Sequence, residues 1–357
     1  MKYLIIAICI FGLAALVYYY FRSRKPSANG YFISSYGQSQ ERVEALGLGR
    51  PSEDVSHLLS SVKFPSHGET AHEREYKADP GTDWIIGLEL APGKHLTKRD
   101  VQDIFDRDWR SNFSSAIYGH SPVDDQWHYA NAGDSPETFD SIQVAVSVQE
   151  IFDEENPDYD PGKLERYLPE LEKKTRKHPA IRSLKAGPVS EAVQKAKKLV
   201  EFHARFNHDA IIVLQSNGMF NGLKAWDALL CTGLKWGDGD LFHWNNHDSN
   251  YGHDQHFSVW TITEPGYFLP ENVKNGQMNP ANLVFGFSIP RSADPKLVFD
   301  AMLNAVKYCQ KRLGGDLLNA EGQPFNEAAE KEKLHALVNE MVQNGLEPGS
   351  DMALRSF

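Results

Sequence analysis

Residues 243–256, HWNNHDSNYGHDQH, gather four histidines and two aspartates within fourteen positions. Imidazole and carboxylate groups are common Zn²⁺ ligands, and the spacings His243-x3-His247 and His253-x2-His256 are compatible with such a site. A zinc ion held here could activate water, and the chain would then be a metal-dependent hydrolase. The competing interpretation is the polar tip of a β-hairpin.

The segments on either side of this stretch favour the hairpin. LFHW precedes it and HFSVWTIT follows it, and both have the composition of strands. A loop offers no preorganised ligand geometry, and no general base or supporting hydrogen-bond partner can be assigned nearby. We therefore predict a solvated hairpin with no metal, and we keep a membrane-bound, metal-dependent hydrolase using the His243–His256 loop as the alternative.

Other catalytic motifs are missing from the sequence. It contains no GxGxxG after a strand, no GxxxxGK[ST], no GxSxG and no HExxH. The acidic run at 150–160, EIFDEENPDYD, lacks the spacing of a calcium loop, so we expect a solvated segment. Cys231 and Cys309 lie among apolar neighbours on predicted helices, as buried inert thiols do. We predict that the protein is not an enzyme and has no cofactor and no small-molecule substrate.

Length and charge narrow the class of protein further. A chain of 357 residues fits two domains and a tether. Its formal net charge of -11 argues against nucleic acid as a partner, because phosphate binding depends on clustered lysine and arginine.

The N-terminal segment 1–21 is predicted to be a transmembrane anchor. Residues 3–21, YLIIAICIFGLAALVYYYF, contain no charged side chain and would rise about 28 Å as a helix, close to the thickness of a bilayer core. A cleaved signal peptide is the alternative, but no A-x-A site follows. Arg22, Arg24 and Lys25 place the remainder in the cytoplasm of a single-pass inner-membrane protein.

The remainder divides by composition into four segments. Residues 22–82 are rich in Ser, Gly, Glu and Pro and are predicted to form a flexible linker. Residues 83–207 and 208–346 each alternate strand and helix patterns, and we expect two α/β domains of the α+β type, possibly a diverged tandem pair. In the first, 153–188 is expected to be an inserted helical excursion. Residues 347–357 are expected to be a tail.

The strands of the second domain present two different faces. In NLVFGFSIP, Leu283, Phe285, Phe287 and Ile289 make a heavy face that we assign to the core. The opposite face carries Val284 and Gly286, and neighbouring strands add further apolar side chains to it. An exposed face of an antiparallel sheet is usually polar, so an apolar one indicates a partner.

The same segments resemble a known family. GLKWGDGDLFHW, FSVWTITEPGYFLPEN and PKLVFDAMLNAVKYCQKRLGGDLLNAEGQP are similar to the C-terminal FtsZ-binding domain of the bacterial cell-division protein ZipA. Phe257, Ser258, Pro265, Gly266, Phe268 and Pro270 match the family pattern position by position, as do Gly237, Asp238 and the Gly314-Gly315 pair. The resemblance covers about residues 208–345.

This resemblance implies an antiparallel sheet with helices packed on one face, and an apolar groove for the C-terminal tail of FtsZ on the other. It places the partner-binding residues at Ile211, Val213, Gln215, Gly239, Leu241, Trp260, Ile262, Val284 and Gly286. The expected mechanism is helix-in-groove recognition. The chain would be an adaptor that binds the bilayer through residues 3–21 and tethers FtsZ filaments at the division septum. An adaptor for a different peptide is also compatible with the sequence.

Four positions depart from the family pattern. Gly239 and Gly286 stand where the family often has large apolar residues, Trp260 replaces a usual alanine, and Glu264 replaces a basic residue. We expect Trp260 to refill part of the groove.

Overall fold

Alternating apolar residues produce the strands, and amphipathic segments produce the helices that cover them. The structure, a computed structural model, describes residues 39–65, 76–148, 162–246 and 251–357. Within these ranges no helix combines the length and the hydropathy needed to cross a membrane, and the predicted anchor at 3–21 lies outside them. The fold is α+β with antiparallel sheets and helices, as the sequence predicts.

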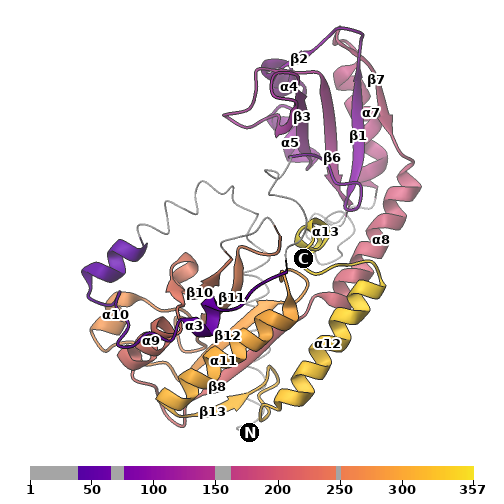
Figure 1. Cartoon of the computed structure of the whole chain (residues 1–357). Coiled ribbons are helices and arrows are strands. Elements are labelled where there is room, and N and C mark those ends of the chain that lie inside the picture. Colours follow the sequence, from indigo (N-terminus) through magenta and orange to yellow (C-terminus); the bar gives the residue numbers. More distant parts are fainter. Residues whose placement is uncertain (1–38, 66–75, 149–161, 247–250) are drawn as a thin grey trace. The chain divides into compact units, whose positions relative to one another are not determined.

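Contacts divide the chain into two units, which are coloured along the sequence in Figure 1. Unit 1 contains residues up to 67 together with His208–Ser350, and unit 2 contains Gly68–Asn207 together with Asp351–Phe357.

Unit 1 is built on a six-stranded antiparallel sheet with the order β13-β8-β12-β11-β10-β9. Its strands are β8 (Asp209–Gln215), β9 (Lys235–Trp236), β10 (Phe242–Asn245), β11 (Gln255–Trp260), β12 (Asn282–Ser288) and β13 (Asp316–Leu318). Its helices are α3 (His57–Ser60), α9 (Gly222–Cys231), α10 (Pro270–Lys274), α11 (Pro295–Leu313), α12 (Glu327–Gln343) and a 3-10 turn, η1 (Asp238–Asp240).

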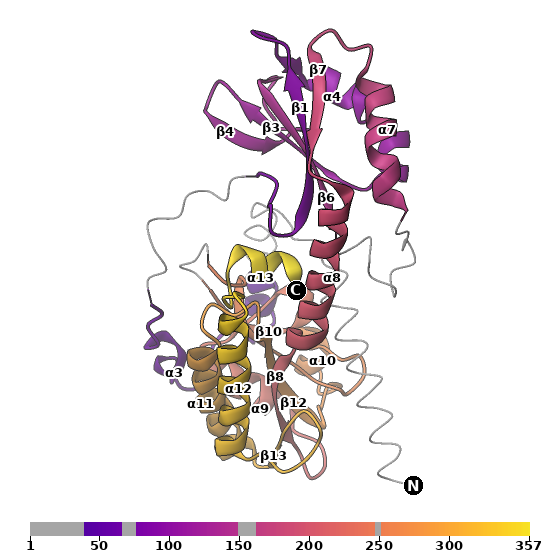
Figure 2. The ribbon, with the colours of Figure 1, turned by 90° about the vertical axis from the view of Figure 1, so that its right-hand side faces the viewer.

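One face of this sheet forms the core of unit 1. Leu283, Phe285, Phe287 and Ile289 are buried, as predicted from their alternation. Helix α11 packs on β8, β11 and β12 from this side, and α12 lies beside it (Figure 2). Helix α11 begins where the sequence predicts, because Asp294 caps the amides of Lys296 and Leu297 and proline occupies the first helical position.

Unit 2 is built on a five-stranded antiparallel sheet with the order β4-β3-β6-β1-β7. Its strands are β1 (Asp83–Leu90), β3 (Ala116–Ser121), β4 (Gln126–Tyr129), β6 (Ser141–Ser147) and β7 (Ile181–Ala186), and β2 (Leu96–Thr97) pairs separately with β5 (Thr138–Phe139). Its helices are α4 (Lys98–Ile104), α5 (Arg107–Asn112), α7 (Lys163–Thr175), α8 (Val189–Phe206) and α13 (Asp351–Ser356).

Local sequence patterns in unit 2 have the structures that they favour, but two larger expectations fail. Thr97 and Asp100 form a capping box at the start of α4, and the alternating residues Ile142, Val144, Val146 and Val148 are buried on one face. The helical excursion expected at 153–188 is wrong, because α7 contributes Leu164, Tyr167 and Leu171 to the core and β7 pairs along β1. The tail at 347–357 instead contains α13, which packs against this unit.

The two sheets contain comparable strands, but their strands are connected in a different order. In unit 2 the first strand of the β3–β4 hairpin pairs with the central strand β6, whereas in unit 1 the second strand of the β10–β11 hairpin pairs with β12. Simple tandem duplication would keep the same strand in the same place. The hypothesis of a tandem pair is therefore contradicted at the level of topology.

Residues 39–65 differ most from the expectation of a flexible linker at 22–82, because they pack on unit 1. Val43 and Leu59 are buried, and Trp226 Nε1 donates to the carbonyl oxygen of Leu48 (2.9 Å). Phe64 stacks on His256 with ring centroids 4.3 Å apart. The polar composition of residues 39–65 led to the wrong prediction, because a few apolar residues spaced along a polar segment are enough to hold it on an existing surface.

Arg312 of α11 fixes the middle of this segment. Its guanidinium forms ion pairs with Asp227 of α9 and with Glu53, and it donates to Ser52 Oγ (2.6 Å). The backbone amide of Ser52 also donates to Asp227 Oδ1 (2.7 Å). We call residues 39–65 the strap.

Candidate functional site

The sheet face opposite the core of unit 1 carries most of the predicted binding residues. Strand pairing sets Val284 of β12 against both Val213 of β8 and Trp260 of β11, and Gly286 against Ile211. Leu241, Trp260 and Val284 form a small buried cluster, with Ile211, Val213 and Tyr267 partly buried around it. Period-two alternation of strand side chains thus gathers residues from three separate strands on one surface.

Tyr267 is a member of this apolar cluster that the sequence did not reveal. It follows the turn at Glu264–Gly266 rather than lying on a strand, so no alternation pattern marks it. A match to the family pattern at Pro265 and Gly266 fixes the turn but not the side on which the next side chain lies.

Trp260 fills the space above Gly286. A Cβ atom built on Gly286 would lie only 2.7 Å from Cη2 of the Trp260 indole and 3.3 Å from the carbonyl oxygen of Ala210. Carbon atoms in contact lie about 3.5–4.0 Å apart, so glycine, which has no Cβ atom, is the residue that fits here. Trp260 and Gly286 are therefore complementary in size, and together they keep this face filled.

The indole nitrogen of Trp260 is a buried donor without a partner. The side chain is 8% exposed, and Nε1 makes no hydrogen bond within the part of the chain that the structure describes. Leaving a buried donor unpaired costs about 1–3 kcal/mol, so native proteins keep few such groups.

The remaining predicted residues lie at the margins of this face. Gln215, which is partly buried, donates through Nε2 to the carbonyl oxygens of Ala281 (3.0 Å) and Ser216 (3.1 Å). Gly239 takes a positive φ of 64° within η1. Ile262 lies beyond the end of β11 and is 41% exposed, outside the cluster, while its amide donates to Asn282 Oδ1 (2.9 Å).

Acidic residues border the cluster, and the strap neutralises two of them. Arg42 forms a bidentate ion pair with Glu271 (2.8 and 2.7 Å) and lies 3.7 Å from Asp240, which directly precedes Leu241. Burial raises the pKa of the Asp240 carboxyl, and Arg42 opposes this rise. The hydrogen bond from Arg42 lowers the pKa of Glu271. Glu264 is exposed on the turn beside Ile262.

The histidine stretch that opened the sequence analysis is part of a hairpin, but two of its histidines are buried rather than solvated. His243 is 4% exposed, with Nε2 2.7 Å from the carbonyl oxygen of Asp238 and Nδ1 2.8 Å from Ser258 Oγ. His256 is also buried and stacks on Phe64 of the strap. His253 Nδ1 accepts from the amide of Gln255 (3.2 Å), and His247 lies outside the described residues.

These contacts give the buried histidines structural roles. Both ring nitrogens of His243 already have hydrogen-bond partners, so a metal would have to displace them. Among the described residues no group of three or more histidine, cysteine or acidic side chains is placed to hold a metal ion. Cys231 and Cys309 are both buried, and burial raises the pKa of the Cys309 thiol.

Comparison with known proteins finds relatives of the region that contains this sheet. Residues 210–336 match the family model described as ZipA, C-terminal FtsZ-binding domain. The chain is 31% identical over 157 residues to the cell division protein ZipA of Shewanella frigidimarina, which covers 43% of this chain and 41% of that protein. It is 27% identical over 127 residues to the ZipA of Shewanella sp. ANA-3, with 35% and 36% of the two chains covered.

The family resemblance found in the sequence is thereby confirmed. The matched residues run from β8 into α12. The chain spans about two fifths of the length of the curated relatives that it matches, and unit 2 lies outside the residues matched by the family model.

Proposed function

We propose that the protein is a cell-division adaptor that binds the C-terminal tail of FtsZ on the apolar sheet face of unit 1. The observation that carries this proposal is the cluster around Trp260, which lies on the face opposite the core and within the residues that match the family model. Apolar side chains on a sheet face away from the core are typical of a docking surface. An amphipathic helix laid on this face would bury Ile211, Val213, Tyr267 and Ile262.

The surface offered to the tail is shallow. Trp260 occupies the centre above Gly286, so a ligand side chain has little depth to enter there. The ligand would contact the edges of the indole and the partly buried residues around it. Shallow contact limits the number of strong anchors, and affinity then depends on a few aromatic and aliphatic contacts.

A small shift of the indole on docking would bring its buried, unpaired N–H to the surface, where it would donate to a backbone carbonyl of the bound tail. Trp260→Phe removes this donor and keeps most of the ring, so we expect tail affinity to fall about fivefold, the effect of one net hydrogen bond. Calorimetric titration of the tail peptide measures this change. Equal affinity of the variant and the parent protein would show that the donor faces another partner, such as a water molecule.

The direct test of the proposed function is a pull-down with FtsZ, with and without its last tail residues. The fragment should be residues 22–357, because a fragment starting at 83 would lose the strap and expose the surfaces that Val43 and Leu59 cover. Capture of full-length FtsZ and loss of capture without the tail are expected. Equal capture of both forms would refute the tail as the ligand.

The membrane part of the proposal rests on residues 3–21. A charge-free segment of that length is sufficient to span a bilayer, and the cluster at Arg22, Arg24 and Lys25 orients the two units toward the cytoplasm at the inner membrane of the septum. A C-terminal alkaline phosphatase fusion should be inactive in cells. An active fusion, or a mature chain that begins after residue 21, would contradict this topology.

A further inference from the structure

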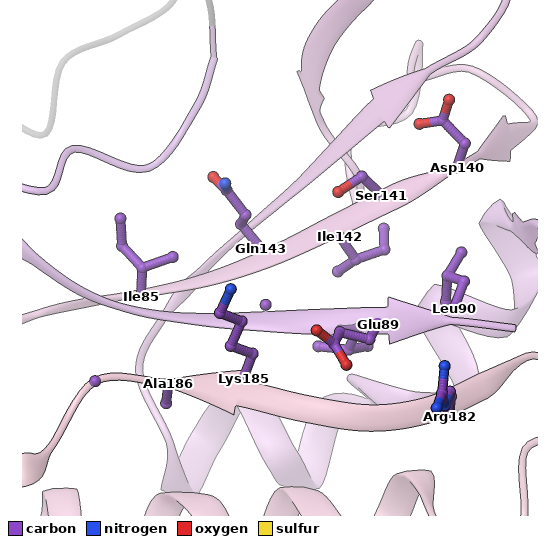
Figure 3. A pocket seen from close by; sticks show the side chains of 13 residues that line it. Ile85, Glu89, Leu90, Asp140, Ser141, Ile142, Gln143, Arg182, Lys185 and Ala186 are labelled. Atoms are coloured by element: carbon purple, nitrogen blue, oxygen red, sulfur yellow. The ribbon is translucent and has the colours of Figure 1, made fainter.

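Unit 2 has its own sheet face opposite its core, and that face is hollowed. Ile86, Leu88 and Leu184 point to the core, so Gly87, Glu89 and Lys185 between them point to the other side. A hollow of about 780 Å³ lies over β6, β1 and β7 on this side. Figure 3 shows Gln143 and Ser141 from β6 and Lys185 from β7 around it.

The floor of the hollow is open backbone. Gly87 lies in its centre, and a Cβ atom built there would meet only the carbonyl oxygen of Lys185, at 3.7 Å. Gly87 has an ordinary backbone conformation in which other residues are tolerated, so the missing side chain is not required by the fold. The glycine leaves room for another chain to approach the sheet.

The charged side chains around the hollow differ in whether they have a partner. The Glu89 carboxylate accepts a hydrogen bond from Ser183, and Asp140 lies 2.8 Å from Nδ1 of His120. Arg182 and Lys185 are exposed and form no ion pair within the described part of the chain. Arg182 and Lys185 both lie on β7, whereas Glu89 lies on β1 and Asp140 lies next to β6. A segment beside β7 therefore meets the cations first, and an anionic ligand is favoured there.

Both cations come from an edge strand. In the described part of the chain β7 pairs with β1 on one side and has no strand on the other. An unpaired edge presents amide and carbonyl groups that an extended segment can use, and cationic side chains on it keep it from pairing with a second copy of itself. The same cations would attract an acidic strand.

The face continues into an apolar end. Ile85, Ala116 and Trp127 are partly buried against Tyr118 and Ala145, which are themselves buried. A ligand that follows the sheet from the cations toward Ile85 therefore passes from a charged surface to an apolar one. This change from a charged to an apolar surface fits an acidic segment that also carries an apolar side chain.

We propose that this face of unit 2 binds an extended acidic segment of a partner protein, which lies beside β7 with its carboxylates against Arg182 and Lys185. The partner is independent of the tail ligand proposed for unit 1. Unit 2 is then a second docking module and not only a spacer.

The test uses the full chain and two synthetic peptides of about six residues, the usual length of a strand. One peptide alternates glutamate and valine, and the matched peptide has lysine in place of glutamate. Fluorescence anisotropy should show at least about tenfold tighter binding of the glutamate peptide, and the difference should shrink as salt is raised. Equal binding of both peptides, or no binding of the glutamate peptide, would overturn the proposal.

Two sets of variants locate the binding. Arg182→Glu combined with Lys185→Glu should weaken the glutamate peptide at least about tenfold, because attraction becomes repulsion. Lys177→Glu combined with Lys197→Glu alters the net charge equally at exposed positions outside the hollow and should leave binding unchanged. Identical losses in the control pair would mean that only overall charge matters.

Hydrogen exchange distinguishes the proposed site from binding elsewhere. Addition of the glutamate peptide should slow exchange of the amides in Ile181–Ala186, the strand whose outer edge would gain a partner. Protection confined to other parts of the chain would refute strand addition at β7.

Discussion

The close packing of the Trp260 indole on Gly286 leads to a quantitative prediction. Gly286→Leu places a Cβ atom 2.7 Å from the indole and adds a larger side chain beyond it, where the ring already fills the space. Overpacking of this kind costs about 1–3 kcal/mol. Because the carbonyl oxygen of Ala210 lies 3.3 Å from the same Cβ position, the backbone of β8 leaves little room for relief.

Trp260→Ala is destabilising for the opposite reason. The indole is almost completely buried against Val284 and Leu241, and truncating a buried aromatic side chain costs about 3–5 kcal/mol. In the double variant the leucine at 286 occupies the space that the indole leaves. We therefore expect the double variant to be less destabilised than the sum of the singles, with a coupling energy of about 1–3 kcal/mol.

Hydrogen-exchange mass spectrometry at increasing urea concentration is the suitable assay. Peptides from β8 and β12 report on unit 1 alone, so the unfolding of unit 2 does not enter the result. Met341→Ala with Gly286→Leu serves as a control cycle, because Met341 is a buried residue of α12 outside the Trp260 cluster, and separated sites are expected to be additive. Additive losses in the Trp260 cycle would refute the idea that these two residues fill one space.

Three further predictions concern other parts of the molecule. Ile262→Glu should leave unit 1 folded, since the side chain is 41% exposed, and should lower the affinity for the FtsZ tail about tenfold as measured by calorimetry. Phe285→Glu places a charge in the core and should unfold unit 1, which circular dichroism would show. Arg312→Met should cost about 1–3 kcal/mol and speed hydrogen exchange in residues 50–59, because the strap loses its ion pairs; unchanged exchange there would contradict its role. The hydrogen bond with Asp140 raises the pKa of His120, and Asp125 adds to this rise. The stabilisation of unit 2 is therefore complete below the unfolded pKa of about 6.5 and is lost as pH rises through the higher folded pKa. Thermal unfolding of unit 2 should show this decline, and Asp140→Asn should reduce it; an unchanged decline would contradict the role of Asp140.

The sequence predicts the parts of this fold that depend on local patterns. The alternation in SIQVAVSV and NLVFGFSIP identifies β6 and β12 and their buried faces, and Asp294-Pro295 marks the start of α11. These features follow from neighbouring residues alone, because side-chain direction in a strand and capping of a helix are local properties.

The features that the sequence missed depend on contacts between distant residues. Strand β7, IRSLKA, has a polar face because it is an edge strand, so its composition resembles a loop. The strap is held by Arg312 and Trp226, both more than 150 positions away along the chain. The hydrogen bonds of His243 are to nearer partners, the Asp238 carbonyl oxygen and Ser258 on the paired strand β11, and strand pairing rather than residue type makes this histidine a part of the sheet.

The predicted binding residues also divide into those that local strand patterns place and those that other contacts place. Six of the nine are gathered on or beside the sheet face because strand register brings them there, while Ile262 follows the end of β11 and lies outside the cluster. No pattern in the sequence shows that β11 ends at Trp260, because the alternation continues through Thr263. The end is set by Asn282, whose side chain accepts the amide of Ile262.

The strap also changes how far the docking face could travel from a membrane. A chain that is free from residue 22 to residue 82 could extend about 200 Å, whereas one that is fixed from residue 39 onward can extend at most about 60 Å between residues 22 and 38. With the anchor proposed at residues 3–21, a docked FtsZ tail would be held close to the bilayer whatever path those residues take. Release of the strap would lengthen this reach, and it would also remove Arg42 from Asp240 and Glu271 beside the docking face. The distance from membrane to filament and the charge next to a docked tail would therefore change together.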